Sequence, residues 1–188
     1  ERPDDFQMSH PEEKPESDKA EAPVDNLSPD RKPIAATLNI ADGQRGVSYS
    51  RLFNPYLIGA KNIKLVDPYV RYDYQIHNFL NFCEGLTASD SGLSIELVTG
   101  ADTKFQENEI ATKFDEIKEN LTQDRISLTY RFDTTLHDRW IETDTGWRII
   151  LGRGLDIFQK PEGKFALGFV DQTKRRCKAT TITYVKKA

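Results

Sequence analysis

Residues 62–99 read NIKLVDPYVRYDYQIHNFLNFCEGLTASDSGLSIELVT, an amphipathic stretch between two short apolar runs. From Ile76 to Cys83 the apolar side chains recur three or four residues apart, which predicts a helix that begins near Asp73. The two flanking runs are too short for helices and are rich in Ile, Leu and Val, so we expect them to be strands. This order of strand, helix and strand is typical of a parallel βαβ unit.

The residues on either side extend the same order. Apolar side chains between Ile110 and Leu121 are spaced four, three and four apart, which predicts a second helix, and residues 126–132 follow as a third strand. Upstream, Ser48 is a candidate N-cap for a helix over residues 49–57. Residues 34–40 alternate loosely and are expected to form an edge strand.

The C-terminal third of the chain predicts strands without intervening helices. Residues 139–143 and 147–151 flank Asp144-Thr145-Gly146, a good turn signal for a β-hairpin. Residues 165–170 and 181–185 are expected to be two further strands. The whole pattern predicts an α/β domain in which a mixed β-sheet is sandwiched by helices.

Residues 1–33 differ in composition from the rest of the chain. They hold six of the nine prolines and carry ten acidic residues against five basic ones. They have few large apolar side chains, so burial offsets little of the ordering entropy of about 1–2 kcal/mol per residue. We therefore expect a disordered, acidic, Pro-rich linker over 1–33 and one folded domain over 34–188.

Several classes of protein do not fit this sequence. No apolar run approaches the roughly 20 residues that cross a bilayer, so no membrane-spanning helix is expected. Cys83 and Cys177 lie in an apolar and a basic segment, which argues against a disulfide framework and favours a reducing cytoplasm. His10 and His77 have no partners at metal-ligand spacing, so we expect no structural zinc and no cofactor.

The stretch with the most chemical information is His137-Asp138-Arg139, followed by Asp144 and the Gly-rich run 152–156. A histidine can attack a phosphodiester, a basic residue can neutralise the phosphate oxygens, and a carboxylate can orient the histidine. The spacing resembles the His-x-Lys-x4-Asp motif of the phospholipase D superfamily. Arg139 replaces the lysine, however, and the chain has one half-site where these enzymes need two. His137, Arg139 and Asp144 are therefore candidate catalytic residues only if the protein is an enzyme.

Binding a phosphate group requires suitable hydrogen-bond donors but no nucleophile or orienting carboxylate. His137, Arg139 and Arg153 are candidate phosphate ligands, because a guanidinium group matches phosphate with its planar fork of donors. Asp67 and Arg71 complete the candidate site, since Asp67 ends a strand of the expected parallel sheet, where ligands of open α/β folds bind. As the alternative, these arginines form ion pairs with neighbouring carboxylates, and His137 is a hydrogen-bonded residue at a strand end.

A basic cluster lies near the C-terminus and consists of Lys174, Arg175, Arg176 and Lys178. Such a run is by default a solvated surface. Close to an anionic membrane each of these residues could contribute about 1 kcal/mol of binding free energy. The same cluster would hold a nucleic-acid backbone with a steep dependence on salt.

Further blocks of sequence give a narrower resemblance. They are Asp67–Arg71, His77–Leu80, Phe82–Glu84, His137–Arg139, Gly146-Trp147, Gly152–Phe158, Lys160-Pro161, Phe165–Gly168 and Arg176–Thr181. From about Val47 to Lys187 these blocks resemble the phospholipase D-like C-terminal domain of MIT-domain proteins. The resemblance implies a phospholipase D-like mixed β-sheet flanked by helices, and a domain without catalytic activity.

In eukaryotic members of that family the domain forms dimers and binds phosphoinositide-bearing membranes, and an N-terminal MIT domain contacts the ESCRT-III machinery. Residues 1–33 are too short and too rich in proline to be that MIT domain. The resemblance therefore implies a homodimer that is the C-terminal part of a larger protein with a different or more distant upstream module.

Three functions stay open on this evidence. The leading interpretation is a non-catalytic binding and dimerisation module, a pseudoenzyme that recognises acidic phospholipid membranes or a nucleic-acid backbone. It would be cytoplasmic and peripheral at membranes. The alternative is a phosphodiesterase or nuclease whose site is shared across a homodimer. The third is a protein-interaction domain without phosphate affinity.

Overall fold

The predicted βαβ order is present in the computed structural model of the chain, which describes residues 27–163 and 165–188. Its elements are β2 (Asn62–Val66), α2 (Asp73–Glu84), β3 (Leu93–Thr99), α3 (Lys104–Thr122) and β4 (Ile126–Phe132). β3 lies between β2 and β4 and pairs in parallel with both. The sequence prediction of a parallel unit with crossover helices is therefore confirmed.

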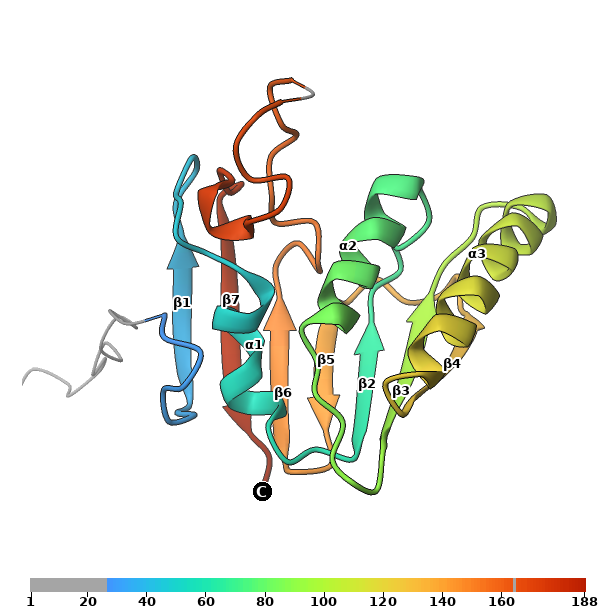
Figure 1. Cartoon of the computed structure of the whole chain (residues 1–188), viewed down its shortest axis with the longest axis horizontal. Coiled ribbons are helices and arrows are strands. Elements are labelled where there is room, and N and C mark those ends of the chain that lie inside the picture. The colour runs from blue at the N-terminus through green and yellow to red at the C-terminus, as the bar shows by residue number, and fades with distance from the viewer. Residues whose placement is uncertain (1–26, 164) are drawn as a thin grey trace, which may run out of the picture.

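Four further strands extend the sheet on the other side of β2. The remaining elements are β1 (Ala36–Ile40), α1 (Tyr49–Leu57), β5 (Trp140–Thr143), β6 (Trp147–Leu151), the short 3-10 helix η1 (Gln172–Lys174) and β7 (Thr180–Lys186). β5 pairs antiparallel with β2, β6 with β5, β7 with β6, and β1 with β7. The result is one mixed sheet in the order β1-β7-β6-β5-β2-β3-β4 (Figure 1).

Strand direction decides which loops meet. Two antiparallel pairings separate β6 from β2, so β6 runs in the same direction as the parallel strands, and β1 does too. β1, β2, β3, β4 and β6 therefore end at one edge of the sheet, which we call the carboxyl edge. The hairpin turn between β5 and β6 lies at the opposite edge.

The described α-helices pack on one face of the sheet (Figure 1). The N-terminus of α1 is capped as the sequence predicts: the Ser48 hydroxyl accepts a hydrogen bond from the Arg51 backbone N–H at 3.2 Å. The Thr103 hydroxyl does the same for Gln106 at 3.1 Å. The apolar stripes of the helices fill the core, where Phe53, Phe79 and Phe114 have no exposed surface. The fold class, a mixed sheet flanked by helices, is confirmed.

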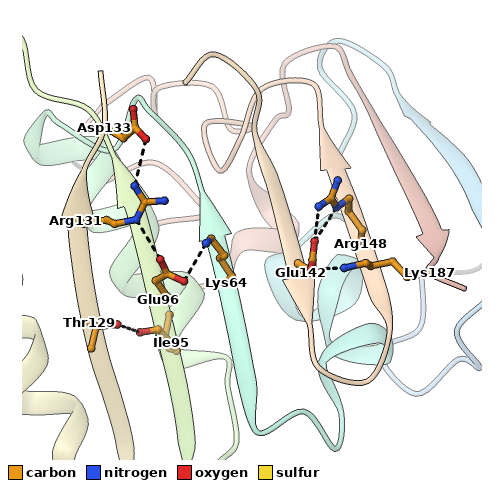
Figure 2. Close-up of polar contacts among 9 residues, drawn as sticks. All are labelled: Lys64, Ile95, Glu96, Thr129, Arg131, Asp133, Glu142, Arg148 and Lys187. Carbon is orange, nitrogen blue, oxygen red and sulfur yellow. Dashed lines mark hydrogen bonds and ion pairs between the residues drawn. The ribbon is translucent and has the colours of Figure 1, made fainter. Parts of the chain in front are cut away.

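The other face of the sheet is not covered by a helix of the described residues, so the expected sandwich is wrong in this respect. The reason is the polar half of the strand alternation, which Figure 2 shows. Glu96 lies 3.1 Å from Lys64 and 3.3 Å from Arg131 across neighbouring strands. Glu142 accepts hydrogen bonds from Arg148 and Lys187 in the same way. Charged side chains that neutralise one another keep this face hydrated.

Two other expectations need correction. Residues 165–170, predicted as a strand, form an exposed loop between β6 and β7, because no neighbouring strand pairs with them. Leu27 and Arg31, assigned to the linker, contact the domain: Leu27 packs on the core, and the Arg31 guanidinium lies 5.6 Å from the centre of the Tyr56 ring. Residues 1–26 of the predicted linker lie outside the described residues.

Candidate functional site

The carboxyl edge gathers segments that are far apart in the sequence. Asp67 follows β2, Gly100 follows β3, Asp133 follows β4, Gly152 follows β6, and Arg139 precedes β5. This edge is where open α/β sheets bind ligands. It carries all of the candidate phosphate-binding residues, which are His137, Arg139, Arg153, Asp67 and Arg71.

Asp67 joins two of these segments. Its side chain is buried, with Oδ1 accepting a hydrogen bond from the Tyr69 backbone N–H at 3.1 Å. Oδ2 accepts one from the Leu155 backbone N–H at 3.0 Å. Gly154 has φ +61° and passes so close that a Cβ on it would lie 2.0 Å from Oδ2. Asp67 thus fixes the 152–156 turn against the end of β2, and both of its oxygens are occupied by backbone donors.

Burial also changes the protonation of this carboxyl group. Desolvation raises the pKa of Asp67 to about 6, against the opposing effects of the Leu155 and Tyr69 backbone N–H groups and of Arg139. A carboxyl group that is buried and bound to two N–H donors does not bind a phosphate anion directly. Asp67 therefore supports the edge instead of contacting a ligand.

A cleft of about 210 Å³ opens at the ends of β2, β3 and β4. Tyr69, Arg71, Asp102, Asp133 and His137 are among its lining residues. It brings together His137 and Arg71, which are 66 positions apart in the sequence. The cleft is thus the place where a small anion could meet two of the predicted ligands.

The cations around this cleft are largely neutralised. Arg71 forms a salt bridge with Asp102, and Asp133 forms one with Arg131 at 3.2 Å. The Arg71 guanidinium also lies 5.4 Å from the centre of the Tyr69 ring. The ion pairs leave little net positive potential for an external phosphate group.

The three remaining candidate ligands form no salt bridge with described residues. His137 is exposed and forms no hydrogen bond or ion pair with another described residue. Arg139 lies 5.1 Å from the centre of the Tyr69 ring and has no salt bridge within residues 27–163 and 165–188. Arg153 is exposed and donates from Nε to the Ala179 carbonyl at 3.0 Å. No carboxylate in the described chain orients His137 for nucleophilic attack.

Asp144, the third residue of the predicted catalytic motif, lies elsewhere. It belongs to the β5–β6 turn at the edge opposite His137. Its carboxylate accepts hydrogen bonds from the Lys61 backbone N–H at 3.1 Å and from Asn62 Nδ2 at 3.0 Å. The motif spacing is present in the sequence, but β5 separates its histidine and its aspartate along the length of a strand.

The predicted basic cluster divides into two pairs of residues. Arg175 is half-buried with its guanidinium 4.9 Å from the centre of the Phe158 ring, and Lys178 forms a salt bridge with Asp156 at 2.8 Å. Lys174 and Arg176 are exposed and have no salt bridge within the described residues. Arg175 and Lys178 hold the loop together, whereas Lys174 and Arg176 are available to a ligand.

Arg45 is a third exposed cation in this region, and the sequence analysis did not identify it as a site residue. The Gly46 backbone N–H donates to the Thr173 carbonyl and the Cys177 N–H donates to the Gln44 carbonyl, both at 2.8 Å. These bonds hold the loop around Arg45 beside the basic cluster. Arg45 itself is exposed. No local signal predicts this contact, because it joins segments about 130 residues apart.

Two features of the described chain concern membranes and metals. None of its helices combines the length and the apolar composition that crossing a bilayer requires. In residues 27–163 and 165–188, no three His, Cys, Asp or Glu side chains are grouped so that they could hold a metal ion.

Comparison with known proteins adds two findings. Residues 46–186 match the family described as the phospholipase D-like domain at the C-terminus of MIT. The chain is also 35% identical over 147 residues to mouse MIT domain-containing protein 1. That alignment covers 77% of this chain and 59% of the relative, so the chain spans less than two thirds of the mouse protein.

Proposed function

This chain belongs to the family of phospholipase D-like domains at the C-terminus of MIT proteins, and we propose that it is a non-catalytic binding module for phosphate-bearing ligands. One observation carries the proposal: Arg45, Lys174 and Arg176 are exposed on one part of the carboxyl edge without salt bridges to described residues. Each such cation near an anionic surface contributes about 1 kcal/mol of binding free energy. An acidic phospholipid surface is the ligand we favour, and the domain would then be peripheral at cytoplasmic membranes.

The proposal leaves out catalysis for physical reasons. His137 lacks an orienting carboxylate among the described residues, and Asp144 lies at the opposite edge. An arginine such as Arg139 can bind phosphate, but it stands where the superfamily motif has lysine. A shared site would require a second copy to bring its own His137 to this edge, and diester turnover tests that alternative.

Dimerisation is the second part of the proposal. β4 is the last strand on its side of the sheet, so one row of its backbone N–H and C=O groups faces no strand of the described residues. Such an edge can pair with a second copy. Light scattering after size exclusion should then give twice the 21.5 kDa mass of the chain. A single-chain mass at all accessible concentrations would contradict dimerisation and leave the ligand proposal intact.

The proposal also includes an upstream module. The mouse relative is longer than the matched region, which supports a multidomain arrangement for this chain as well. In that arrangement the module upstream would select the partner protein, and the domain described here would supply attachment to the phosphate-bearing surface.

Co-sedimentation with vesicles tests the binding function. Vesicles of phosphatidylcholine alone are compared with vesicles that also contain phosphatidylserine, at low and high salt, with single-stranded DNA as competitor. We expect binding only to the anionic vesicles, and loss of binding at high salt. Stronger binding to DNA than to the vesicles would assign the edge to nucleic acid instead. No binding to either would contradict the proposal.

A triple variant identifies the surface. Arg45→Ala/Lys174→Ala/Arg176→Ala should weaken partitioning into anionic vesicles by about a hundredfold, at about 1 kcal/mol for each charge. Lys32→Ala/Lys61→Ala/Lys118→Ala removes the same charge from exposed lysines away from this edge and serves as the matched control. Equal loss in the two variants would mean that net charge, not this surface, attracts the vesicles.

A further inference from the structure

The loop between β6 and β7 exposes an unusual amount of apolar surface. Phe165 and Val170 are 99% exposed, Leu167 is 74% exposed and Phe169 is 62% exposed. We call these four side chains the apolar tip. In Figure 1 the loop projects beyond the carboxyl edge of the sheet, drawn in orange to red. Single exposed apolar residues are ordinary, but contiguous ones mark interaction sites.

The base of this loop is built into the domain. Phe158 and Cys177 form an isolated β-bridge, and both are buried. The Gln159 N–H donates to the Arg176 carbonyl and the Lys178 N–H to the Ile157 carbonyl, each at 2.8 Å. The loop therefore leaves from a fixed two-stranded stem, in a direction away from the sheet.

A close contact connects the apolar tip to the basic cluster. Gly168 is buried with φ +101°, and a Cβ on it would lie 2.3 Å from Cγ of Arg175. Only glycine lets the backbone approach Arg175 so closely. The residues on both sides of Gly168 are thereby held next to η1, which carries Lys174.

Cations are the more numerous exposed charges around the base of the apolar tip, where Asp42, Glu162 and Asp171 are also exposed. Lys160, Lys174 and Arg176 are exposed, and Arg45 lies on the adjacent loop. Exposed apolar side chains on a projecting loop with cations beside them match an anionic bilayer, which is apolar below a layer of phosphate groups. A second copy of the chain is a poorer match, because docking tip to tip would bring the like charges of the two copies together. Nucleic acid is also a poorer match, since two of the four side chains, Leu167 and Val170, offer no ring on which a base can stack.

We propose that the apolar tip inserts into the interfacial layer of an anionic lipid bilayer while Arg45, Lys174 and Arg176 contact the headgroup phosphates. The inference rests on the proposed function and deepens it by naming the ligand as a bilayer and the inserting residues. Insertion of each large apolar side chain contributes about tenfold to partitioning. It also distinguishes a bilayer from a soluble phosphate compound, which offers nothing to the apolar tip.

A fluorescent label tests insertion directly. Leu167→Cys carries an environment-sensitive dye, and Ile58→Cys is the matched control, since Ile58 is 71% exposed and lies beyond the end of α1 near the opposite edge. The native thiols do not compete: Cys83 and Cys177 are buried, and burial raises the pKa of the Cys177 thiol to about 11. With phosphatidylcholine–phosphatidylserine vesicles, the dye at position 167 should shift to the blue and be quenched by spin-labelled lipid. The dye at position 58 should not change.

Substitution provides the second readout. Phe165→Ser/Phe169→Ser should weaken partitioning into these vesicles by about a hundredfold. It should leave thermal unfolding unchanged, because both side chains are exposed. Ile34→Ser/Ile58→Ser removes exposed apolar surface elsewhere and should bind like the native chain.

The outcomes separate this inference from the proposed function. If the native chain binds anionic vesicles but the dye at position 167 does not shift and Phe165→Ser/Phe169→Ser binds normally, insertion is wrong and electrostatic binding stands. If the native chain binds no anionic vesicle, both are wrong. If the dye at position 167 shifts on raising the protein concentration without vesicles, and the double variant lowers the mass in solution, the tip is occupied by a second copy and the inference is overturned.

Discussion

The carboxyl edge has two halves that differ in how their charges are used. The cleft half is formed by residues 67–72, 100–102 and 133–139, and the loop half by residues 42–46 and 172–178 together with the apolar tip. In the cleft half Arg71 forms a salt bridge with Asp102, and Arg139 lies over the Tyr69 ring. In the loop half Arg45, Lys174 and Arg176 form no salt bridge with described residues. The motif resemblance to phosphodiesterases suggests the cleft half as the ligand-binding site. The cations without salt bridges suggest the loop half instead.

This difference has a physical consequence for binding. To bind an external phosphate, Arg71 would have to give up its contact with Asp102. The net gain in binding free energy from this exchange is small. Lys174 and Arg176 exchange only water and counterions. The family resemblance thus draws attention to a pocket that holds an internal ion pair, whereas the proposed interaction uses a neighbouring loop.

The strongest prediction concerns the turn between the two halves. Gly154→Ala should lower the free energy of unfolding by about 4 kcal/mol, because the new Cβ would overlap Asp67 Oδ2 and φ is +61°. Urea denaturation measures the change. Gly163→Ala is the control, since a Cβ there meets no atom within 4 Å. Equal stability of the two variants would show that the turn does not rest on Asp67.

The next prediction is the pH dependence of stability at Asp67. Folding raises the pKa of this carboxyl group from 3.8 to about 6, so its neutral form is favoured in the folded state. Its contribution to stability is fully present below pH 3.8 and is lost as the pH rises through 6. The loss amounts to about 3 kcal/mol.

Asp67→Asn provides the comparison for this pH effect. The variant should be less stable at low pH, because an amide cannot accept hydrogen bonds from both N–H donors. The diagnostic quantity is the difference in unfolding free energy between native and variant, followed from pH 3 to pH 7. We expect it to decrease as the pH rises. A difference independent of pH would contradict the raised pKa.

A smaller effect is expected on the open face of the sheet. Glu142→Gln should cost about 1 kcal/mol or less, because its partners Arg148 and Lys187 are partly solvated. The substitution also frees two cations far from the loop half. Binding to anionic vesicles should stay within about twofold of native, as sedimentation can measure. A large gain would mean that any free cation recruits vesicles, and would remove the distinction between the halves.

The smallest expected effect is on catalysis in the cleft half. We expect no turnover of a chromogenic phosphodiester or of single-stranded DNA by the native chain or by His137→Ala. The reason is that no carboxylate of the described residues activates His137. Turnover that disappears with His137 would contradict the binding module and favour a site shared between two subunits.

The elements could be read from the sequence where local patterns decide them. The spacing from Ile110 to Leu121 identified α3, Ser48 capped α1 as predicted, and the turn at 144–146 closed the expected hairpin. The period of the apolar residues indicates which face of an element is buried, and this period is a property of one short segment of sequence.

Properties that depend on distant partners could not be read in this way. Phe165, Leu167 and Phe169 alternate as in a strand, but alternation does not reveal whether a partner strand exists. The contact of Arg71 with Asp102 and the approach of Arg45 to the basic cluster are likewise products of the fold.

The displacement of Asp144 has a simple geometric reason. A strand rises about 3.3 Å per residue, so the five steps from Arg139 to Asp144 span most of the sheet height. The spacing of a sequence motif does not show whether its residues share a site. When the residues between them form a strand, as β5 does here, they lie at opposite edges of the sheet.

The central claim is that phosphate-bearing surfaces bind the loop half and not the cleft half. Sedimentation with phosphatidylcholine–phosphatidylserine vesicles should compare Lys174→Ala/Arg176→Ala with Arg71→Ala/Arg139→Ala, two variants of equal charge. The account predicts that the first pair weakens binding by about thirtyfold and the second by about threefold or less. Loss of binding in the second pair, with the first pair unaffected, would contradict it and assign the ligand to the cleft.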